Sequence, residues 1–433
     1  MYDVIVVGGG FAGVTAAREA ALRGSRVVLL EGRDRLGGRT WTAEWRGHQV
    51  EYGGGWVHWH QPHTWSEISR GGLEVELSED AERAAWYVGD QRRAGTIGER
   101  DAIALRGWDR FVEGVEQALP QPYDPLLRLE HLIRFDRQTI AERMDEIELD
   151  DEERAVLQAE LESLAHGRLD DAGAVSVLRW HALSGYSLAL TQYTGGRVTL
   201  AGGTVSLLQA IAGGAEFEMR LESPVEAVEQ NGETVVVEAR SGERLEARAV
   251  VVAVPLNALP GITFAPALSD LKQQGVALGQ ASRGIKIFIE ATGEAVYQNA
   301  IRPEHEFGYL DTEIMGANGS QVMIGFGLDA AQCDATDRAG VQDAMDRIMP
   351  GYRVVASSAH DWLADEFSRG TWAIHRPGWY EHYHAEMRRP EGRVVLAGSD
   401  LANGWAGFID GAIESGLRSG VLAHRIAAAG VAV

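Results

Sequence analysis

Cysteine, basic residues and long apolar runs are all scarce in this sequence of 433 residues. Cys333 is the only cysteine, which excludes a disulfide framework, a thiolate metal cluster and a Cys-x-x-Cys redox pair. Lysine and arginine total 40 against 63 acidic residues, and the net charge is −23, so no nucleic-acid partner is expected. No run approaches the roughly 20 apolar residues of a membrane-spanning helix. The C-terminal AHRIAAAGVAV is too short as well, so no membrane partner is expected.

The composition is that of a globular protein, with 45% hydrophobic residues, 24% charged residues and 52 glycines. A chain of this length is expected to fold as two or three domains around a large core. A glycine-rich motif starts a few residues after Met1 and leaves no room for a signal peptide. A cytoplasmic location is therefore expected, unless a leader has been removed.

The first 31 residues carry the motif around which the chain is organised. Residues 4–7 form an apolar run of strand length, residues 12–23 have helical spacing, and residues 26–30 form a second apolar run. Between the first run and the helix, Gly8, Gly10 and Gly13 match G-x-G-x-x-G. These glycines permit a tight turn, close approach of a pyrophosphate, and packing of helix on strand. Glu31 follows the second strand, at the position where an acidic residue accepts hydrogen bonds from ribose hydroxyls. Strand, glycine loop, helix, strand and acid in this order predict a dinucleotide-binding site.

Two further glycine clusters follow. The loop GRDRLGGRTWT brings the backbone of Gly37 and Gly38 close to a neighbour and places Arg33 and Arg39 beside the expected pyrophosphate. A charged surface loop is the alternative, but the position directly after the ribose acid favours the ligand. A hairpin-like stretch then leads to a glycine cluster at residues 53–55.

Residues 56–65, WVHWHQPHTW, contain three histidines and three tryptophans. The histidines have no carboxylate or cysteine between them and lack the i, i+4 spacing of H-E-x-x-H sites, so no metal site is expected. We expect these rings to form an amphipathic wall near the ligand, with some of them packed in the core.

Periodicity assigns much of the remaining chain. Helices are expected over residues 95–119, 139–166, 174–183, 200–212 and 337–349, and strands over residues 321–328 and 353–360. A meander over residues 225–255 has turns at Asn231-Gly232 and Ser241-Gly242. Its last run, residues 249–254, is continuously apolar, as in a buried parallel strand. The acidic helical block between residues 75 and 195 is expected to cover the reactive end of the ligand.

G-x-G-x-x-G, E-x-R, L-G-G-R and G-G-x-W, in this order, resemble the opening of the flavin-containing amine oxidase family, which includes monoamine and polyamine oxidases. The resemblance implies FAD rather than NAD. It also implies an α/β fold in which a Rossmann-like FAD-binding domain is interleaved with a substrate domain of mixed sheet and helices. The expected FAD-binding domain is residues 1–75, 198–265 and 390–433. The expected substrate-binding domain, with its helical cover, is residues 76–197 and 266–389.

The resemblance also implies the FAD contacts. They are Gly8, Gly10, Phe11, Ala12, Gly13, Glu31, Gly32, Arg33, Gly38, Arg39, Thr40, Gly54, Gly55, Trp56, Val225, Ala253, Pro255, Trp362, Thr371, Gly398, Ser399, Asp400, Gly407, Phe408 and Ile409. Thr371 occupies the position of the cysteine that binds flavin covalently in monoamine oxidases. Since a hydroxyl cannot form that thioether, FAD is expected to be bound non-covalently. A long helix starts near Gly407, and its N-terminus would favour negative charge on the cofactor.

Three residues are expected to be catalytic. Lys286 lies in a stretch where residues 285, 287 and 289 are isoleucines, so by periodicity alone it is a solvated strand lysine. The family, however, carries a lysine on a strand here, bound through a water molecule to flavin N5, and the resemblance therefore favours a catalytic role. Trp372 and Phe408 match the two aromatic cage positions, with Phe408 in place of a tyrosine.

The family oxidises the α-carbon of an amine by hydride transfer to flavin N5, and the iminium product is then hydrolysed. The reactive substrate is the neutral amine, which an apolar cage favours by desolvating the cation. Amino-acid oxidases of the family have a Met-Arg pair where residues 56–58 read Trp-Val-His, so an amino-acid substrate is disfavoured. GGGWVHWHQPH, RGTW and GWAGFIDGAIESG are most similar to the bacterial branch that oxidises nicotine, pseudooxynicotine and related alkaloid amines. The expected substrate pocket consists of His58, Trp59, Trp372, Trp405, Ala406 and Phe408.

The expected substrate is therefore a small hydrophobic secondary or tertiary amine, with O2 or another carrier as electron acceptor. A polyamine or a simple primary monoamine is the alternative within the family, because polyamine oxidases also show G-x-W-[IV]-H. A different FAD-dependent oxidoreductase, such as a desaturase, and a non-catalytic flavin-binding module are further alternatives, against which Lys286 and the cage residues argue. Members of the family often dimerise, so the resemblance also raises the expectation of a homodimer.

Overall fold

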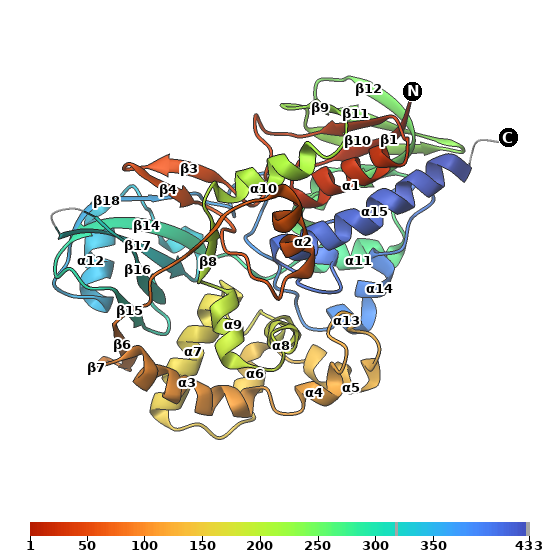
Figure 1. Ribbon diagram of the computed structural model, residues 1–433. Helices are drawn as coiled ribbons and strands as arrows, with labels where there is room; N and C mark the ends of the chain where they lie inside the picture. Colours follow the sequence, from red (N-terminus) through yellow and green to blue (C-terminus); the bar gives the residue numbers. More distant parts are fainter. Residues whose placement is uncertain (317–318, 430–433) are drawn as a thin grey trace.

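A computed structural model describes residues 1–316 and 319–429 of the chain. The last four residues of the C-terminal AHRIAAAGVAV lie outside these described residues. The chain forms a mixed α/β fold in which one sheet lies near both termini, a second sheet lies beside α12, and a layer of helices borders both (Figure 1). This is the fold class that the resemblance implies.

The first sheet has eight strands in the order β13-β10-β11-β12-β1-β2-β9, with β19 paired to β12. β1 (Tyr2–Val7) runs parallel to β2 (Val27–Leu30) and β12 (Arg244–Val252), and β19 (Val394–Leu396) runs parallel to β12. Their apolar residues are almost completely buried, as expected for parallel strands covered on both faces. The strands predicted over residues 4–7, 26–30 and 249–254 are confirmed.

Helices α1 (Phe11–Leu22) and α15 (Ile409–Ala429) pack closely against each other and against this sheet (Figure 1). A Cβ atom on Gly416 would lie 2.5 Å from the Ala12 carbonyl oxygen, and one on Gly420 would lie 2.4 Å from that of Ala16. Both distances are too short for any larger residue, so these two glycines set the spacing of the helices. The helices predicted over residues 12–23 and from near residue 407 are confirmed within two residues.

An antiparallel meander extends the first sheet. It consists of β10 (Val225–Asn231), β11 (Thr234–Ala239) and the first half of β12. Gly232 and Gly242 adopt φ angles of +67° and +85° in the two turns, a conformation that glycine adopts without steric cost. Both predicted turns are confirmed. The edge strands are β13 (Thr263–Ala265) and β9 (Glu218–Arg220).

The second sheet has seven strands in the order β18-β14-β17-β16-β15-β6-β7. They are β14 (Ile285–Thr292), β15 (Gln298–Ile301), β16 (Tyr309–Met315), β17 (Ser320–Gly327), β18 (Arg353–Ala359), β6 (Arg83–Val88) and β7 (Gln91–Gly95). Helix α12 (Arg338–Ile348) packs beside β18. The prediction of a purely helical block between residues 75 and 195 is wrong at β6 and β7. The segment RAAWYV is buried on both faces, so its sequence lacks the polar alternation that indicates a strand.

Helices form the layer at the lower edge of Figure 1. They are α3 (Ile97–Phe111), α4 (Val115–Ala118), α5 (Leu129–Asp136), α6 (Ile140–Asp145), α7 (Asp151–Ala165), α8 (Ala174–Leu183) and α9 (Leu188–Thr194). Asp150 caps α7, and its carboxylate accepts hydrogen bonds from the N–H groups of Glu152 and Glu153. The bounds of α8 are those predicted. The helix predicted over residues 95–119 is divided at Gly114, whose φ angle is +84°, and the one over residues 139–166 is divided between α6 and α7.

The remaining elements are short hairpins and connecting helices. They are β3 (Thr42–Trp45), β4 (His48–Glu51), α2 (Pro62–Gly71), β5 (Val75–Leu77), β8 (Val198–Leu200), α10 (Gly203–Ala212), η1 (Leu256–Gly261), α11 (Asp270–Leu278), η3 (Ala330–Gln332), α13 (Trp379–His382), α14 (His384–Met387) and η4 (Ser399–Leu401). β3 and β4 form the predicted hairpin.

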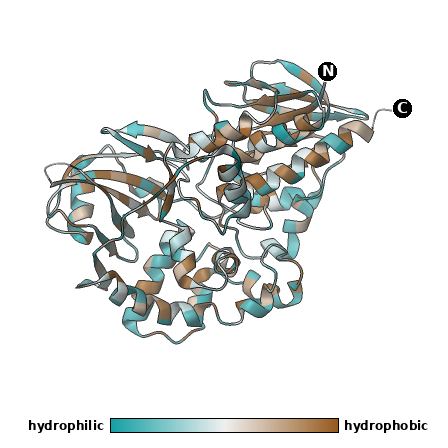
Figure 2. Cartoon of the chain, in the orientation of Figure 1, coloured by the Kyte–Doolittle hydropathy of each residue, from teal (hydrophilic) through white to brown (hydrophobic). Residues whose placement is uncertain are grey.

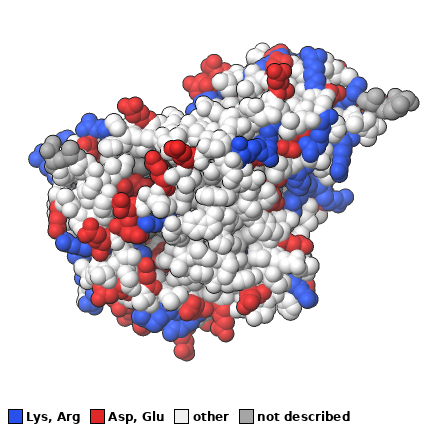
Figure 3. Space-filling model, in the orientation of Figure 1, with Lys and Arg blue, Asp and Glu red and all other residues white. Residues whose placement is uncertain are grey.

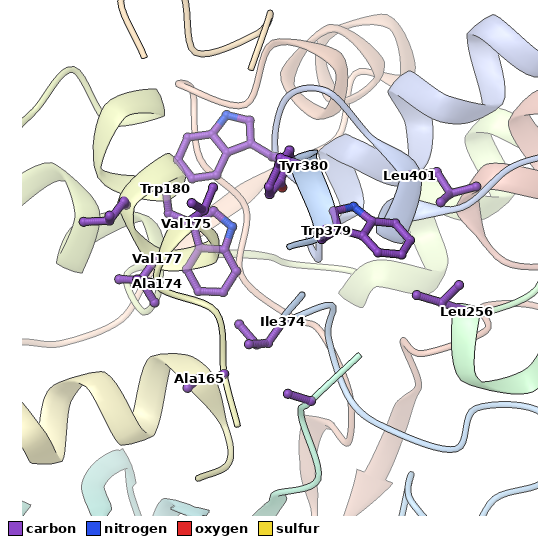
Figure 4. Packing of buried hydrophobic residues seen from close by; sticks show 14 of the residues in the cluster. Ala165, Ala174, Val175, Val177, Trp180, Leu256, Ile374, Trp379, Tyr380 and Leu401 are labelled. Atoms are coloured by element: carbon purple, nitrogen blue, oxygen red, sulfur yellow. The ribbon is translucent and has the colours of Figure 1, made fainter. Parts of the chain in front are cut away.

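Buried aromatic residues connect the helical layer to the C-terminal third of the chain. Trp180 of α8, Ile374, Trp379 and Tyr380 belong to one apolar cluster (Figure 4). Figure 2 shows alternating apolar and polar residues along α1 and α15, where one side of each helix faces the sheet. On the face shown in Figure 3 the charged side chains lie mainly around the periphery of the molecule. Among residues 1–316 and 319–429, no helix combines the length and the apolar character needed to cross a bilayer.

Candidate active site

A cavity of about 450 Å³ is lined by residues of both sheets and of the helical layer. Its lining begins at the glycine loop after β1 and includes residues 30–33, 37–40 and 52–56. Strands β14, β16 and β17, helices α3, α7, α8 and α9, and the start of α15 complete it. The cavity therefore connects the predicted dinucleotide motif to the helical layer.

The glycine loop between β1 and α1 has the tight geometry that its motif predicts. Gly8 has a φ angle of +103°, and a Cβ atom on it would lie 2.6 Å from the Ala253 carbonyl oxygen. A Cβ atom on Gly13 would lie 1.9 Å from the Gly8 carbonyl oxygen, so Gly13 permits the packing of helix on strand. Helix α1 begins after Gly10 without a capping side chain. Its first N–H groups are therefore available to an anion such as a pyrophosphate.

The acid at the end of β2 is held by the backbone. Glu31 is buried; its Oε2 accepts a hydrogen bond from the Gly9 N–H at 2.6 Å, and its Oε1 accepts one from the Arg33 N–H at 2.8 Å. The Arg33 guanidinium donates to Asp365 at 2.6 Å and to the Ser368 hydroxyl at 2.8 Å. These contacts fix both side chains at the edge of the cavity, where the carboxylate can still accept a ribose hydroxyl.

A buried ion pair joins the second glycine segment to the C-terminal region. Arg39 donates to the Thr371 carbonyl oxygen at 2.7 Å, to the Ser399 hydroxyl at 2.9 Å, and to the Asp400 carboxylate. Asp400 also accepts from the Leu256 N–H at 2.8 Å. Burial would raise the pKa of Asp400, but the Arg39 guanidinium, the Leu256 N–H and His375 together lower it. Asp400 therefore holds the Arg39 side chain in place at the cavity.

The structure brings nearly all the predicted FAD contacts to this one cavity. The residues in its lining are Gly8, Gly10, Phe11, Ala12, Glu31, Gly32, Arg33, Gly38, Arg39, Thr40, Gly54, Gly55, Trp56, Val225, Ala253, Pro255, Trp362, Thr371, Gly398, Ser399, Gly407, Phe408 and Ile409. Gly13 and Asp400 are not in the lining, because Gly13 packs beneath Gly8 and Asp400 is covered by Arg39. The glycine backbones, the uncapped start of α1 and the arginines fit a dinucleotide such as FAD.

Lys286 lies in the cavity lining and is only 4% exposed. Its Nζ donates to the Gly53 carbonyl oxygen at 3.1 Å and lies 4.3 Å from the centre of the Trp56 ring. Burial lowers its pKa to about 8, although Glu51 and Glu313 act in the opposite direction. The interpretation of Lys286 as a solvated strand lysine is therefore wrong. Periodicity missed its burial because both faces of β14 are covered.

Aromatic rings surround the part of the cavity near Lys286. Trp372 and Phe408 both line it, as predicted. The Trp372 indole stacks on His166, with ring centroids 4.2 Å apart, and donates its N–H to the Leu164 carbonyl oxygen at 2.9 Å. Phe408 packs edge-on against Trp180, with centroids 5.2 Å apart. The cage position at Phe408 is thus supported by the helical layer.

The Thr371 hydroxyl is part of a chain of hydrogen bonds. Ser282 donates to the Trp372 carbonyl oxygen at 2.6 Å, and Thr371 donates to the Ser282 hydroxyl oxygen at 2.8 Å. Because each hydroxyl has one proton, the contact of 2.9 Å between Thr371 Oγ and His166 Nδ1 requires the histidine to donate. Burial lowers the pKa of His166 to about 4, so its ring is neutral. Thr371 is therefore fully engaged by protein groups.

Four residues of the predicted substrate pocket, His58, Trp59, Trp405 and Ala406, are not in the cavity lining. His58 is completely buried, and burial lowers its pKa to about 4, whereas Trp59 is 46% exposed on the surface. Trp405 is buried and donates its N–H to the His60 carbonyl oxygen at 3.1 Å, and the Ala406 carbonyl oxygen accepts from Trp180 at 3.0 Å. The motifs place these residues next to the cavity in sequence, but their side chains do not line it.

Several lining residues were not predicted from the sequence. They are Arg100, Trp108, Glu160, His166, Trp180, Tyr309, Asp311, Glu313 and Phe326. Most come from the helical layer and from β16, where no motif marks them. The alternation of Tyr309, Asp311 and Glu313 along β16 is the one signal that would have placed them on a common face. In the described part of the chain, no group of three or more His, Cys, Asp or Glu side chains is arranged to hold a metal ion.

Comparison with known proteins identifies the family. Residues 11–421 match the family described as flavin containing amine oxidoreductase. A pseudooxynicotine dehydrogenase from Pseudomonas sp is 36% identical over 97% of this chain and 85% of that protein. A nicotine dehydrogenase from Pseudomonas putida is 33% identical over 97% of this chain and 87% of its own length. An (S)-6-hydroxynicotine oxidase from Paenarthrobacter nicotinovorans is 30% identical over 96% of this chain and 97% of that protein.

Solved structures show the same fold. A putrescine oxidase bound to putrescine superposes with a TM-score of 0.82 at 22% identity, covering 97% of this chain and 98% of that one. A cyclohexylamine oxidase from Brevibacterium oxydans gives a TM-score of 0.80 at 20% identity, covering 98% of this chain and 99% of that one. The motifs, the cavity and the match over nearly the whole length agree: the chain belongs to the flavin containing amine oxidoreductase family and is an FAD-dependent enzyme.

Proposed function

We propose that this enzyme oxidises a hydrophobic secondary or tertiary amine of the nicotine and pseudooxynicotine type. The observation that carries the proposal is the aromatic chamber beside the buried Lys286, with Trp372 and Phe408 in its lining. The names of three relatives at 30–36% identity support the same substrate class.

FAD would be held by the glycine loop, by Glu31, and by the arginine-supported segment around Arg39. When bound, FAD supplies the acceptor for the hydride that leaves the α-carbon of the amine. We propose that the cofactor is non-covalent, because the Thr371 hydroxyl has no thiolate chemistry and is engaged by His166 and Ser282. The uncapped start of α1 would bind the pyrophosphate.

The chain's own residues prepare the amine for oxidation by excluding water. Trp56, Phe326, Trp372 and Phe408 present ring faces and edges to the chamber. An ammonium ion loses hydration there, so its pKa falls and the neutral amine, which carries the required lone pair, is favoured. Lys286 Nζ, held by the Gly53 carbonyl oxygen, places a positive charge beside the same chamber. We propose that this charge supports the reduced cofactor.

The test is anaerobic mixing of the holoenzyme with a panel of amines: nicotine, pseudooxynicotine, benzylamine, putrescine, spermidine and leucine. Bleaching of the flavin bands by nicotine or pseudooxynicotine is the expected result. Bleaching by putrescine or spermidine alone would replace this substrate class with polyamines. Admitting air afterwards shows whether O2 or another carrier is the acceptor, and light scattering of the same sample determines whether the enzyme is a homodimer.

A further inference from the structure

The cavity has an acidic end as well as an aromatic one. Glu160 of α7 and the β16 residues Asp311 and Glu313 all line it. Tyr309, Asp311 and Glu313 alternate along β16, so one face of the strand presents a phenol and two carboxylates to the cavity. An amine oxidase needs no carboxylate for the oxidation itself, so these acids have no role in the chemistry proposed above.

The β16 acids have few partners in the described part of the chain, and Glu313 accepts a hydrogen bond from the Ser78 hydroxyl at 3.4 Å. Tyr309 donates to Asp311 Oδ2 at 3.2 Å, but the other oxygen, Oδ1, is buried and has no hydrogen-bond partner in the part of the chain that the structure describes. Within residues 1–316 and 319–429, neither Asp311 nor Glu313 forms an ion pair within 4.0 Å. An orphaned carboxylate oxygen in a cavity is costly unless a ligand satisfies it.

The basic groups nearby are committed elsewhere. Arg100 donates to Asp101 at 2.6 Å and to the Asn299 side chain, and lies 3.9 Å from Glu160. Lys286 donates to the Gly53 carbonyl oxygen. Three carboxylates thus line this end of the cavity, and the two cations of the lining near them, Arg100 and Lys286, are already hydrogen-bonded, which leaves this end electronegative and suited to a basic nitrogen.

A row of rings connects the acidic end to the cage. Tyr309 packs against Phe326 with centroids 5.8 Å apart, and Phe326 packs against Trp372 at 6.1 Å. A ligand that places one nitrogen beside Trp372 therefore has an apolar surface leading towards Asp311. This arrangement suits a substrate with two nitrogens separated by a carbon skeleton.

We propose that Asp311, Glu313 and Glu160 form a distal acidic subsite that binds a second basic nitrogen of the substrate, remote from the carbon that is oxidised. The inference rests on the proposed function and narrows its substrate class. The second nitrogen is either a protonated aliphatic amine or a pyridine ring nitrogen, and both are recognised by a carboxyl group. An ammonium ion donates to the ionised form, whereas a pyridine nitrogen accepts from the protonated form.

The two kinds of nitrogen differ in their pH dependence. Burial raises the pKa of Asp311 to about 7, with Glu313 adding to the effect, and burial raises that of Glu160 to about 7 against the opposing charge of Arg100. The charged groups facing these acids are Arg100, Asp101, Lys286 and Arg197. Between pH 6 and 8, binding of an ammonium group should therefore strengthen as the carboxyls ionise. Binding of a pyridine nitrogen should weaken over the same range.

The experiment uses three secondary amines that differ only at the far end: N-methyl-4-(pyridin-3-yl)butylamine, N-methyl-4-phenylbutylamine and N-methylbutane-1,4-diamine. The concentration giving half-maximal flavin reduction is measured anaerobically with the holoenzyme. We expect the wild type to prefer one of the two-nitrogen amines over the phenyl compound by roughly tenfold or more. Asp311→Asn and Glu313→Gln should each remove most of that preference, because the value for the two-nitrogen amine should change much more than the value for the phenyl compound.

Glu294→Gln serves as the matched control, because Glu294 lies at the surface, 64% exposed, and pairs with Arg83. It should keep the wild-type preference. Equal use of the phenyl and two-nitrogen amines by the wild type, or an unchanged preference in both subsite variants, would overturn the subsite while the amine oxidase function stands. If no compound bleaches the flavin, the proposed function fails. In that case the spectral shift on binding still reports whether the second nitrogen matters, and no difference between the ligands would reject the subsite too.

Discussion

The imidazole of His166 lies parallel to the indole of Trp372, with ring centroids 4.2 Å apart and an angle of 7° between the planes. Leu164, two residues before this histidine, accepts a hydrogen bond from the same indole at 2.9 Å. The end of α7 therefore fixes the cage residue through both its face and its N–H group. A segment of the helical layer, and not only the C-terminal motif, orients the aromatic chamber.

His166→Ala should lower the rate of flavin reduction roughly tenfold, since loss of a stacked ring and its packing costs about 1–3 kcal/mol at this position. FAD content should stay at the wild-type level. His166→Phe keeps a ring against Trp372 and should retain most of the rate. Rapid-mixing kinetics under anaerobic conditions measure both variants. Equal losses in the two variants would show that the hydrogen bond to Thr371, and not the stacking, is what matters.

Lys286→Met should raise the stability of the protein at pH 7. Burial lowers the folded-state pKa of Lys286 to about 8, so wild-type stability decreases as pH falls from the ordinary lysine pKa of about 10.5 through 8. At pH 7 the buried lysine is protonated, and its charge lowers the free energy of unfolding by roughly 3 kcal/mol. The methionine variant has no charge there and does not lose this free energy. Thermal unfolding at pH 7 and pH 9.5 should show a larger difference at pH 7. The same variant should alter reduction or reoxidation of the flavin; wild-type kinetics would remove Lys286 from the mechanism.

Acid precipitation should release all the flavin into the supernatant. Thr371 occupies the position at which a cysteine would form a thioether, and its hydroxyl is hydrogen-bonded to His166 and Ser282. Absorbance of the supernatant and of the washed pellet measures the partition. A yellow pellet would contradict the assignment of a non-covalent cofactor.

Gly420→Ala should destabilise the protein by about 1–3 kcal/mol, because overpacking forces two helices apart. Its added methyl group would lie 2.4 Å from the Ala16 carbonyl oxygen, and α1 carries the glycine loop. Gly98→Ala in α3 is the matched control, with no atom within 4 Å of the added group, and should be neutral or slightly stabilising. Thermal unfolding compares the two. Similar melting temperatures for both variants would contradict the prediction, because they would mean that α1 and α15 move apart to admit the methyl group without loss of stability.

The sequence predicted the dinucleotide-binding half of the molecule well, because its signals are local. Gly8 and Gly13 need specific backbone geometry, and the apolar run at residues 249–254 needs a parallel sheet. Asn231-Gly232 determines its own turn. Such features depend on a few neighbouring residues, so a short motif is enough to place them.

The chamber could be predicted only in part, because most of its walls come from packing between distant segments. Trp180 lies on α8 and His166 directly follows α7, and no motif marks either position. Asp311 becomes part of the cavity only when β16 joins the second sheet. Conversely, Trp59 and Trp405 stand within recognisable motifs, yet one is exposed and the other packs behind the cavity wall. Proximity in sequence to a motif does not determine which way a side chain points.

The most direct test of the account is the visible spectrum of the holoenzyme, recorded without air as nicotine or pseudooxynicotine is added over a range of pH. We predict that the flavin bands bleach, and that the rate rises with pH towards the pKa of the amine, because the chamber oxidises the neutral form. A bound flavin that no amine of the panel bleaches at any pH would contradict the account and favour a non-catalytic flavin-binding role.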